Sequence, residues 1–144
     1  MKLKELLTIG ELRNCKILTK EIGLDNEVAS AMVLEALDIE QWSKSNQLIL
    51  TSFYAFNGIS EADLEDFFYK MQKIGVSGLV VKMDRLIKII PEWVIQLSFS
   101  YQIPLIKIAQ DISYEKILLT IYEPLLNHQT HVLRTYYEVR QRFT

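Results

Sequence analysis

Polar side chains follow three apolar segments of the chain at the points where those segments end. Thr51 and Ser52 end the first segment, Lys82 and Asp84 follow the second, and Asp111 follows the third. In an open parallel sheet, ligands bind beyond the carboxyl ends of the strands. Two hydroxyls, an ammonium group and carboxylates gathered at that edge would hydrogen-bond to a small polar metabolite. The sequence therefore predicts a ligand site there.

An aromatic ring and two further carboxylates belong to the same predicted site. Phe53 would stack on a flat ligand ring, and Glu35 and Asp38 follow an apolar stretch that would reach the edge of the sheet. Two other interpretations of these residues stay open. Asp38, Lys82 and Asp84 could be the acid and base groups of a small enzyme. Alternatively, the strand-end residues only cap and solvate the sheet.

Signatures of enzymes, cofactors and metals are otherwise missing. The sequence contains no G-x-G-x-x-G, no G-x-x-x-x-G-K-[ST] and no G-x-S-x-G motif. Cys15 has no histidine nearby and is expected as a small buried hydrophobe. His128 and His131 would share a helix face, but without a carboxylate or thiolate ligand nearby they would make a weak metal site. The acidic residues at 61–66 suit the first turns of a helix, where they would face water. We therefore expect no catalytic residue, no cofactor and no metal.

The composition of the chain excludes several broad classes. Its 144 residues fit one domain, and its apolar (49%) and charged (24%) fractions are those of a globular protein rather than a disordered one. The formal net charge of −2 gives no general attraction to nucleic acid or to anionic membranes. There is no signal peptide and no apolar run of about 18 residues, and a lone cysteine suits a reducing compartment. We expect a cytoplasmic protein that does not enter a membrane.

The middle of the chain alternates between strand and helix patterns. Short apolar runs at 47–51, 78–82 and 104–108 are typical of buried strands, and helices are expected from Ser60 and from Pro91. This order with short connections predicts an α/β fold, a single domain with a mostly parallel sheet flanked by helices. Shorter elements complete the prediction: a helix at 3–7, strands at 15–18 and 27–34, a turn at 23–26 and a helical turn at 38–43.

The two predicted helices have clear start and stop signals. Ser60 is expected as an N-cap with Asp63 in the capping-box position, and Gly75 as the glycine that ends the same helix. Pro91 is expected at the first helical position, where its missing N–H costs nothing. The buried stripe of the first of these helices would consist of Leu64, Phe67, Phe68, Met71 and Ile74.

The segment from Ser113 to Phe143 predicts a long C-terminal helix with an apolar seam. A 4-3 spacing continues along almost all of it, as in a coiled coil. Pro124 costs about 3 kcal/mol inside a helix, so the segment is expected either as one kinked helix or as two that break near Glu123. We expect residues 114–122 to pack on their own sheet. A homodimer is expected through the later seam residues Val132, Tyr136, Val139 and Phe143.

The order of several short motifs resembles a known family. The motifs are Gly23-Leu24-Asp25, Glu35, Asp38 with Trp42, Leu48-Ile49-Leu50-Thr51, Gly75-Val76-Ser77-Gly78-Leu79 with Lys82, Pro91, and Ile103-Pro104-Leu105-Ile106. Together they are similar to the N-terminal domain of the PucR-like (purine catabolism regulator-like) bacterial transcription regulators. The resemblance runs from about residue 3 to about residue 121.

The resemblance implies a role for each part of the chain. Residues 1–123 would be a regulatory domain that receives a signal and performs no catalysis, and residues 124–144 would be a helix leading toward a missing downstream region. DNA would be contacted only through an absent C-terminal helix-turn-helix domain, and the regulated pathway would be the catabolism of purines or related nitrogen compounds.

The chain has Ser52-Phe53 where the family commonly has Thr-Gly. The alternative function is a protein-interaction or oligomerisation module that binds no metabolite.

Overall fold

A five-stranded sheet forms the centre of the molecule in the computed structural model, which describes residues 1–52, 58–83, 89–109 and 111–127. The strand order is β1-β5-β4-β3-β2, with the last four strands parallel to one another and β1 antiparallel to β5 at one edge. The predicted α/β class and mostly parallel sheet are therefore confirmed. The strands are β1 (Lys16–Ile17), β2 (Ser30–Val33), β3 (Gln47–Ser52), β4 (Gly78–Lys82) and β5 (Leu105–Ile108).

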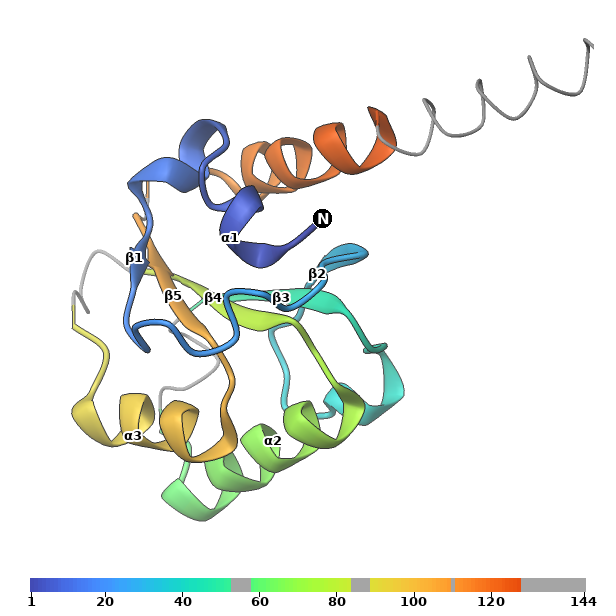
Figure 1. Cartoon of the computed structure of the whole chain (residues 1–144). Coiled ribbons are helices and arrows are strands. Elements are labelled where there is room, and N and C mark those ends of the chain that lie inside the picture. Colours follow the sequence, from blue (N-terminus) through green and yellow to red (C-terminus); the bar gives the residue numbers. More distant parts are fainter. Residues whose placement is uncertain (53–57, 84–88, 110, 128–144) are drawn as a thin grey trace, which may run out of the picture.

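Helices cover both faces of this sheet, in three layers (Figure 1). The connections between the parallel strands lie on one face, and the N-terminal segment and the C-terminal helix lie on the other. The first group consists of the 3-10 turn η2 (Ile39–Gln41), α2 (Glu61–Ile74) and α3 (Glu92–Tyr101). The second consists of α1 (Leu3–Leu6), the 3-10 turn η1 (Gly10–Asn14) and the C-terminal helix, which is described over 114–127.

Helix α2 begins and ends where its sequence predicts. The Ser60 hydroxyl accepts a hydrogen bond from the Asp63 backbone N–H at 3.2 Å, which confirms the N-cap. Gly75 adopts a left-handed conformation with φ of 86°, which a residue with a Cβ rarely adopts. The backbone N–H of Val76 then donates to the Met71 carbonyl, closing the helix with a Schellman motif.

Helix α3 begins one residue later than its sequence predicts. Pro91 is the N-cap of α3 rather than its first helical residue, because its ψ of 144° is extended. Its carbonyl accepts hydrogen bonds from the backbone N–H groups of Val94 and Ile95. The proline ring fixes only φ, so a proline suits the residue before a helix as well as the first residue within it.

The alternation of side chains along each strand divides the interior into two cores. Along β3, Ile49 packs under α2 and α3 in what we call the first core. Leu48 and Leu50 pack under the C-terminal helix, in the second core. Along β4, Leu79 and Val81 pack in the first core, whereas Val80 packs in the second. Because the central strands are buried on both faces, they read in the sequence as continuous apolar runs.

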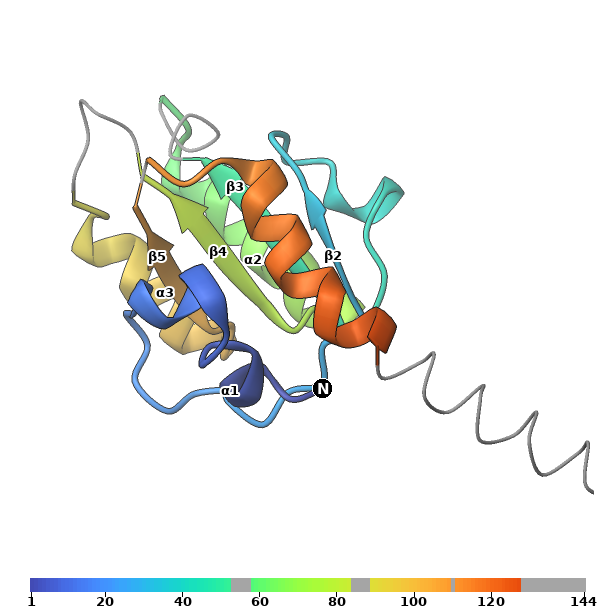
Figure 2. The ribbon, with the colours of Figure 1, turned by 90° about the horizontal axis from the view of Figure 1, so that it is seen from above.

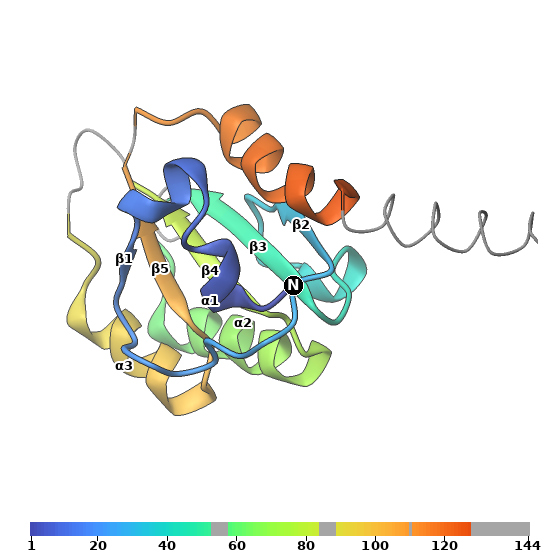
Figure 3. The same cartoon turned by 45° about the horizontal axis from the view of Figure 1, so that its top comes forward.

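The C-terminal helix packs back along its own sheet (Figures 2 and 3). Ile117, Ile121 and Leu125 are buried in the second core, so the prediction that residues 114–122 pack at home is confirmed. Of the two expected arrangements, the described residues show a single helix, because helical backbone continues through Pro124 to residue 127. Burial of Leu125 beyond the proline offsets part of the roughly 3 kcal/mol that an internal proline costs.

Candidate functional site

The ends of β2, β3 and β4 bring three polar side chains to one face of the sheet. Ser52 and Lys82 are register partners at the last positions of β3 and β4. Val33 pairs with Leu50, so Glu35, two residues further along, lies level with Ser52. All three lie on the face that the C-terminal helix covers, because each follows a residue of the second core by two positions.

The Glu35 carboxylate is the centre of a hydrogen-bonded group. Its Oε1 accepts from the Ser52 backbone N–H at 3.0 Å, and its Oε2 accepts from the Ser52 hydroxyl at 2.7 Å. Oε1 also accepts from the hydroxyl of Tyr114 at 2.6 Å. Partial burial and this bond to the carboxylate raise the pKa of Tyr114 well above its usual value. Tyr114 is therefore a neutral donor at physiological pH.

Lys82 lies on the other side of the same tyrosine. Its ammonium nitrogen is 4.9 Å from the centroid of the Tyr114 ring, within the range of a cation–π contact. Within the described part of the chain, no carboxylate lies within ion-pair distance of Lys82. We call Glu35, Ser52, Lys82 and Tyr114 the strand-end cluster. Tyr114 thus connects a carboxylate at the end of β2 with an ammonium group at the end of β4.

A second tyrosine fixes the C-terminal helix to the same edge strand. The hydroxyl of Tyr122 donates to the Ala31 carbonyl at 2.6 Å and accepts from the Ala31 backbone N–H at 3.1 Å. Strand β2 is the last strand of the sheet, and its outward backbone groups would otherwise be unpaired. Tyr122 therefore attaches the helix to β2, and Tyr114 attaches it to Glu35, two residues beyond the end of the same strand.

The connections that leave the sheet diverge next to the strand-end cluster. The chain leaves β4 toward α3 on one face, whereas it leaves β5 toward the C-terminal helix on the opposite face (Figure 1). Adjacent strands whose connections separate in this way leave room for ligands beyond their carboxyl ends. Lys82, at the end of β4, lies at this divergence.

The structure brings together some of the predicted site residues and separates others. Glu35, Ser52 and Lys82 belong to the strand-end cluster. Thr51 does not, because it is buried on the opposite face of β3, and the expected convergence of two hydroxyls is wrong. Asp38 accepts a hydrogen bond from the Trp42 indole at 3.1 Å beside η2 and has no contact with the cluster among the described residues. The other candidates, Phe53, Asp84, Val132, Tyr136, Val139 and Phe143, lie outside the described residues.

Tyr114 is the site residue that sequence reasoning missed. Its sequence neighbourhood shows only the start of an amphipathic helix, and its partner Glu35 is 79 residues away.

Cys15 packs beside the second core, as expected of a small apolar side chain. The described part of the chain contains no group of three or more His, Cys, Asp or Glu that could hold a metal ion. None of its helices is long and apolar enough to span a bilayer.

Comparisons with known proteins agree on one family. The family model described as "Purine catabolism regulatory protein-like family" matches residues 5–125. The chain is 24% identical over 144 residues to the "Purine catabolism regulatory protein" of Bacillus subtilis (strain 168), and it spans 27% of that protein's length.

A solved structure gives a weaker likeness. It contains the CBS and DRTGG domains of the regulatory region of Clostridium perfringens pyrophosphatase, complexed with its activator diadenosine tetraphosphate. It has a TM-score of 0.48 and 12% identity, over 83% of this chain and 46% of that one. The family match is the informative one, since it covers most of the chain: the protein belongs to the purine catabolism regulatory protein-like family.

Proposed function

We propose that this chain is the signal-input domain of a transcription regulator, in which a small polar metabolite binds at the strand-end cluster and alters the packing of the C-terminal helix. The observation that carries the proposal is the position of Tyr114, in the first turn of that helix, bonded to Glu35 and beneath Lys82. The family and the length of the related regulator support a domain that acts on a part of the protein beyond this chain.

The chemistry of the cluster defines the class of ligand. The Lys82 ammonium group has no carboxylate partner among the described residues and would attract a carboxylate or a polarised carbonyl oxygen. Glu35 would accept N–H groups of the same ligand. A compound with adjacent carbonyl and N–H groups, such as an oxidised purine or a ureide, offers both. Such a ligand competes with Tyr114 for the two residues that Tyr114 now contacts.

This competition gives the ligand a way to shift a conformational equilibrium. A ligand changes the balance of two arrangements only by binding one more tightly than the other. With Tyr114 bonded to Glu35, the helix is held at both tyrosines. With the ligand on Glu35 and Lys82, the Tyr122 hydrogen bonds and the packing of the helix on the second core persist, while its first turn is released from Glu35 and changes its packing. DNA binding by a helix-turn-helix domain outside this chain would then respond.

Thermal unfolding with a panel of purines, ureides and amino acids tests the proposal. One chemical class should raise the unfolding midpoint of the wild-type chain, and Lys82→Met should abolish that shift. Lys73→Met is the matched control, because Lys73 is an exposed lysine on α2 at the opposite face of the sheet. The site is wrong if no class stabilises the chain, or if Lys82→Met and Lys73→Met respond alike.

A second candidate function, a homodimerisation module, is supported by the outer face of the C-terminal helix. Leu119 and Leu126 are 62% and 56% exposed although both are large and apolar. They lie seven positions apart, on one stripe of the helix, and Leu133 continues the same spacing in the sequence. A second copy of this helix would cover the stripe.

Light scattering tests the dimerisation function. A dimer whose mass falls to that of a monomer in Leu119→Ser/Leu126→Ser, with its unfolding midpoint unchanged, supports dimerisation through this stripe. A wild-type chain that stays monomeric at all concentrations argues against it. Metabolite sensing does not depend on this result, because the strand-end cluster is formed within one chain.

A further inference from the structure

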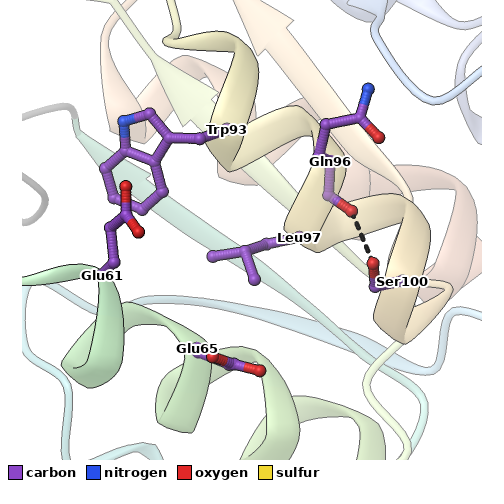
Figure 4. Close-up of a pocket in the computed structure, with 6 residues that line it drawn as sticks. All are labelled: Glu61, Glu65, Trp93, Gln96, Leu97 and Ser100. Atoms are coloured by element: carbon purple, nitrogen blue, oxygen red, sulfur yellow. Dashed lines mark hydrogen bonds between the residues drawn. The ribbon is translucent and has the colours of Figure 1, made fainter.

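A pocket lies between α2 and α3, on the face of the sheet opposite the C-terminal helix (Figure 4). Its volume is about 260 Å³, enough for a small molecule or one end of a larger one. Glu61 and Glu65 extend toward it from α2, and Trp93 and Leu97 from α3. Gln96 and Ser100 complete the lining on α3. This pocket is separate from the strand-end cluster, since the sheet lies between them.

The described residues that line the pocket carry two negative charges and include no basic side chain. Glu61 and Glu65 are one helical turn apart, where like charges destabilise a helix by a few tenths of a kcal/mol. Glu61 makes no ion pair within the described part of the chain, and Lys70 on the same helix pairs with Asp66 and Glu40 instead. Among the described residues, no basic side chain forms an ion pair with either carboxylate.

The orientation of one of these carboxylates is fixed. Glu65 Oε1 accepts a hydrogen bond from the Tyr101 hydroxyl at 3.0 Å, and this bond raises the pKa of Tyr101. Tyr101 in turn contacts Tyr69 edge to face, with ring centroids 6.5 Å apart. Tyr101 thus remains a donor at neutral pH, and the second oxygen of Glu65 accepts no hydrogen bond from the described residues.

The opposite side of the pocket is aromatic and aliphatic. Trp93 and Leu97 pack against the core through part of their surface and present the rest to the pocket. The face of an indole ring is the strongest cation–π acceptor among side chains. Carboxylates on one wall and an indole on the other are the groups that recognise an ammonium or guanidinium ion attached to a short carbon chain.

We infer that the α2–α3 pocket binds a small organic cation. Its ammonium or guanidinium group lies between Glu61 and Glu65, and its carbon chain lies along Trp93 and Leu97. Each partly exposed ion pair strengthens binding by about threefold, so the two together contribute about tenfold. The inference is independent of the strand-end cluster and of the metabolite that binds there.

The intrinsic fluorescence of the chain provides a direct assay. The sequence has two tryptophans, Trp42 and Trp93, and Trp42 is 59% exposed, away from the pocket. In a Trp42→Phe background, the emission reports Trp93 alone. Butylammonium should change this emission in a saturable way. Its neutral isostere 1-butanol should bind about tenfold more weakly, and added salt should weaken the butylammonium response.

Substitutions in the same background complete the test. Glu61→Gln/Glu65→Gln should weaken butylammonium binding about tenfold, whereas Glu115→Gln on the C-terminal helix should leave it unchanged. Circular dichroism with thermal unfolding establishes that each variant is folded, and the single substitution Glu61→Gln serves if the double variant is not. Equal responses to butylammonium and 1-butanol, or binding unaffected by removal of the carboxylates, would overturn the inference.

Discussion

Replacement of Tyr114 by phenylalanine isolates the hydrogen bond that ties the C-terminal helix to the strand-end cluster. The substitution removes one hydroxyl and keeps the ring, so the contact with Lys82 and the packing of the helix persist. Glu35 retains its two hydrogen bonds from Ser52. The change in stability therefore reports the Tyr114–Glu35 bond rather than a general loss of packing.

The expected size of this change follows from the geometry. A hydrogen bond to a charged acceptor contributes about 1.5–3 kcal/mol when it is shielded from water. Glu35 is exposed and Tyr114 half-buried, so we expect about 1–2 kcal/mol for this 2.6 Å bond. With an unfolding entropy of about 2.1 cal/mol/K per residue, 1 kcal/mol corresponds to about 3 °C in a chain of 144 residues. The unfolding midpoint should fall by roughly 3–6 °C.

Urea unfolding followed by circular dichroism measures the loss directly. Tyr69→Phe is the matched control, because Tyr69 is a half-exposed tyrosine whose hydroxyl makes no hydrogen bond with the described residues. A double-mutant cycle with Glu35→Gln should give a coupling energy of about 1 kcal/mol or more between the two positions. The Tyr114–Glu35 bond does not stabilise the fold if Tyr114→Phe is no more destabilising than Tyr69→Phe, or if the coupling energy is zero.

Three further predictions concern the helix ends, the edge strand and the dependence on pH. Ser60→Ala should lower the free energy of unfolding by about 1 kcal/mol, measured in urea, because the Asp63 N–H loses its cap. Tyr122→Phe should cost about 1–3 kcal/mol and speed amide exchange at Ala31, which loses both partners of its backbone groups. Because the folded-state pKa of Tyr114 is raised, its contribution to stability is complete below about pH 10, the unfolded value. That contribution is lost as the pH rises further, so the stability difference between wild type and Tyr114→Phe should stay constant up to about pH 10 and shrink above it.

Elements with strong local signals were predictable from the sequence. The start, the buried face and the end of α2 could be predicted from its cap, its apolar spacing and its terminal glycine, which all lie within one segment. The central strands were recognisable as apolar runs, and two of the polar residues at their ends, Ser52 and Lys82, lie side by side at one edge of the sheet. Glu35, Ser52 and Lys82 were candidates for that reason, and the register brings them into one row.

Features that depend on distant parts of the chain were not predictable. Thr51 and Ser52 point to opposite faces, but a strand buried on both sides hides this alternation in its sequence. The role of Tyr114 depends on where the C-terminal helix crosses the sheet, which no local pattern records. Pro124 suggested a break, yet tertiary packing of Leu125 overrides that local preference. The domain boundary expected between residues 123 and 124 stays a prediction.

The central claim is that the strand-end cluster controls how the C-terminal helix is held. Amide hydrogen exchange of residues 114–127, compared between wild type and Glu35→Gln, tests it most directly. We expect faster exchange in the first turns of this helix and at Ala31 in the variant, with no change in α2 on the opposite face. Exchange that is unchanged in the helix, or accelerated equally across the whole chain, would contradict it.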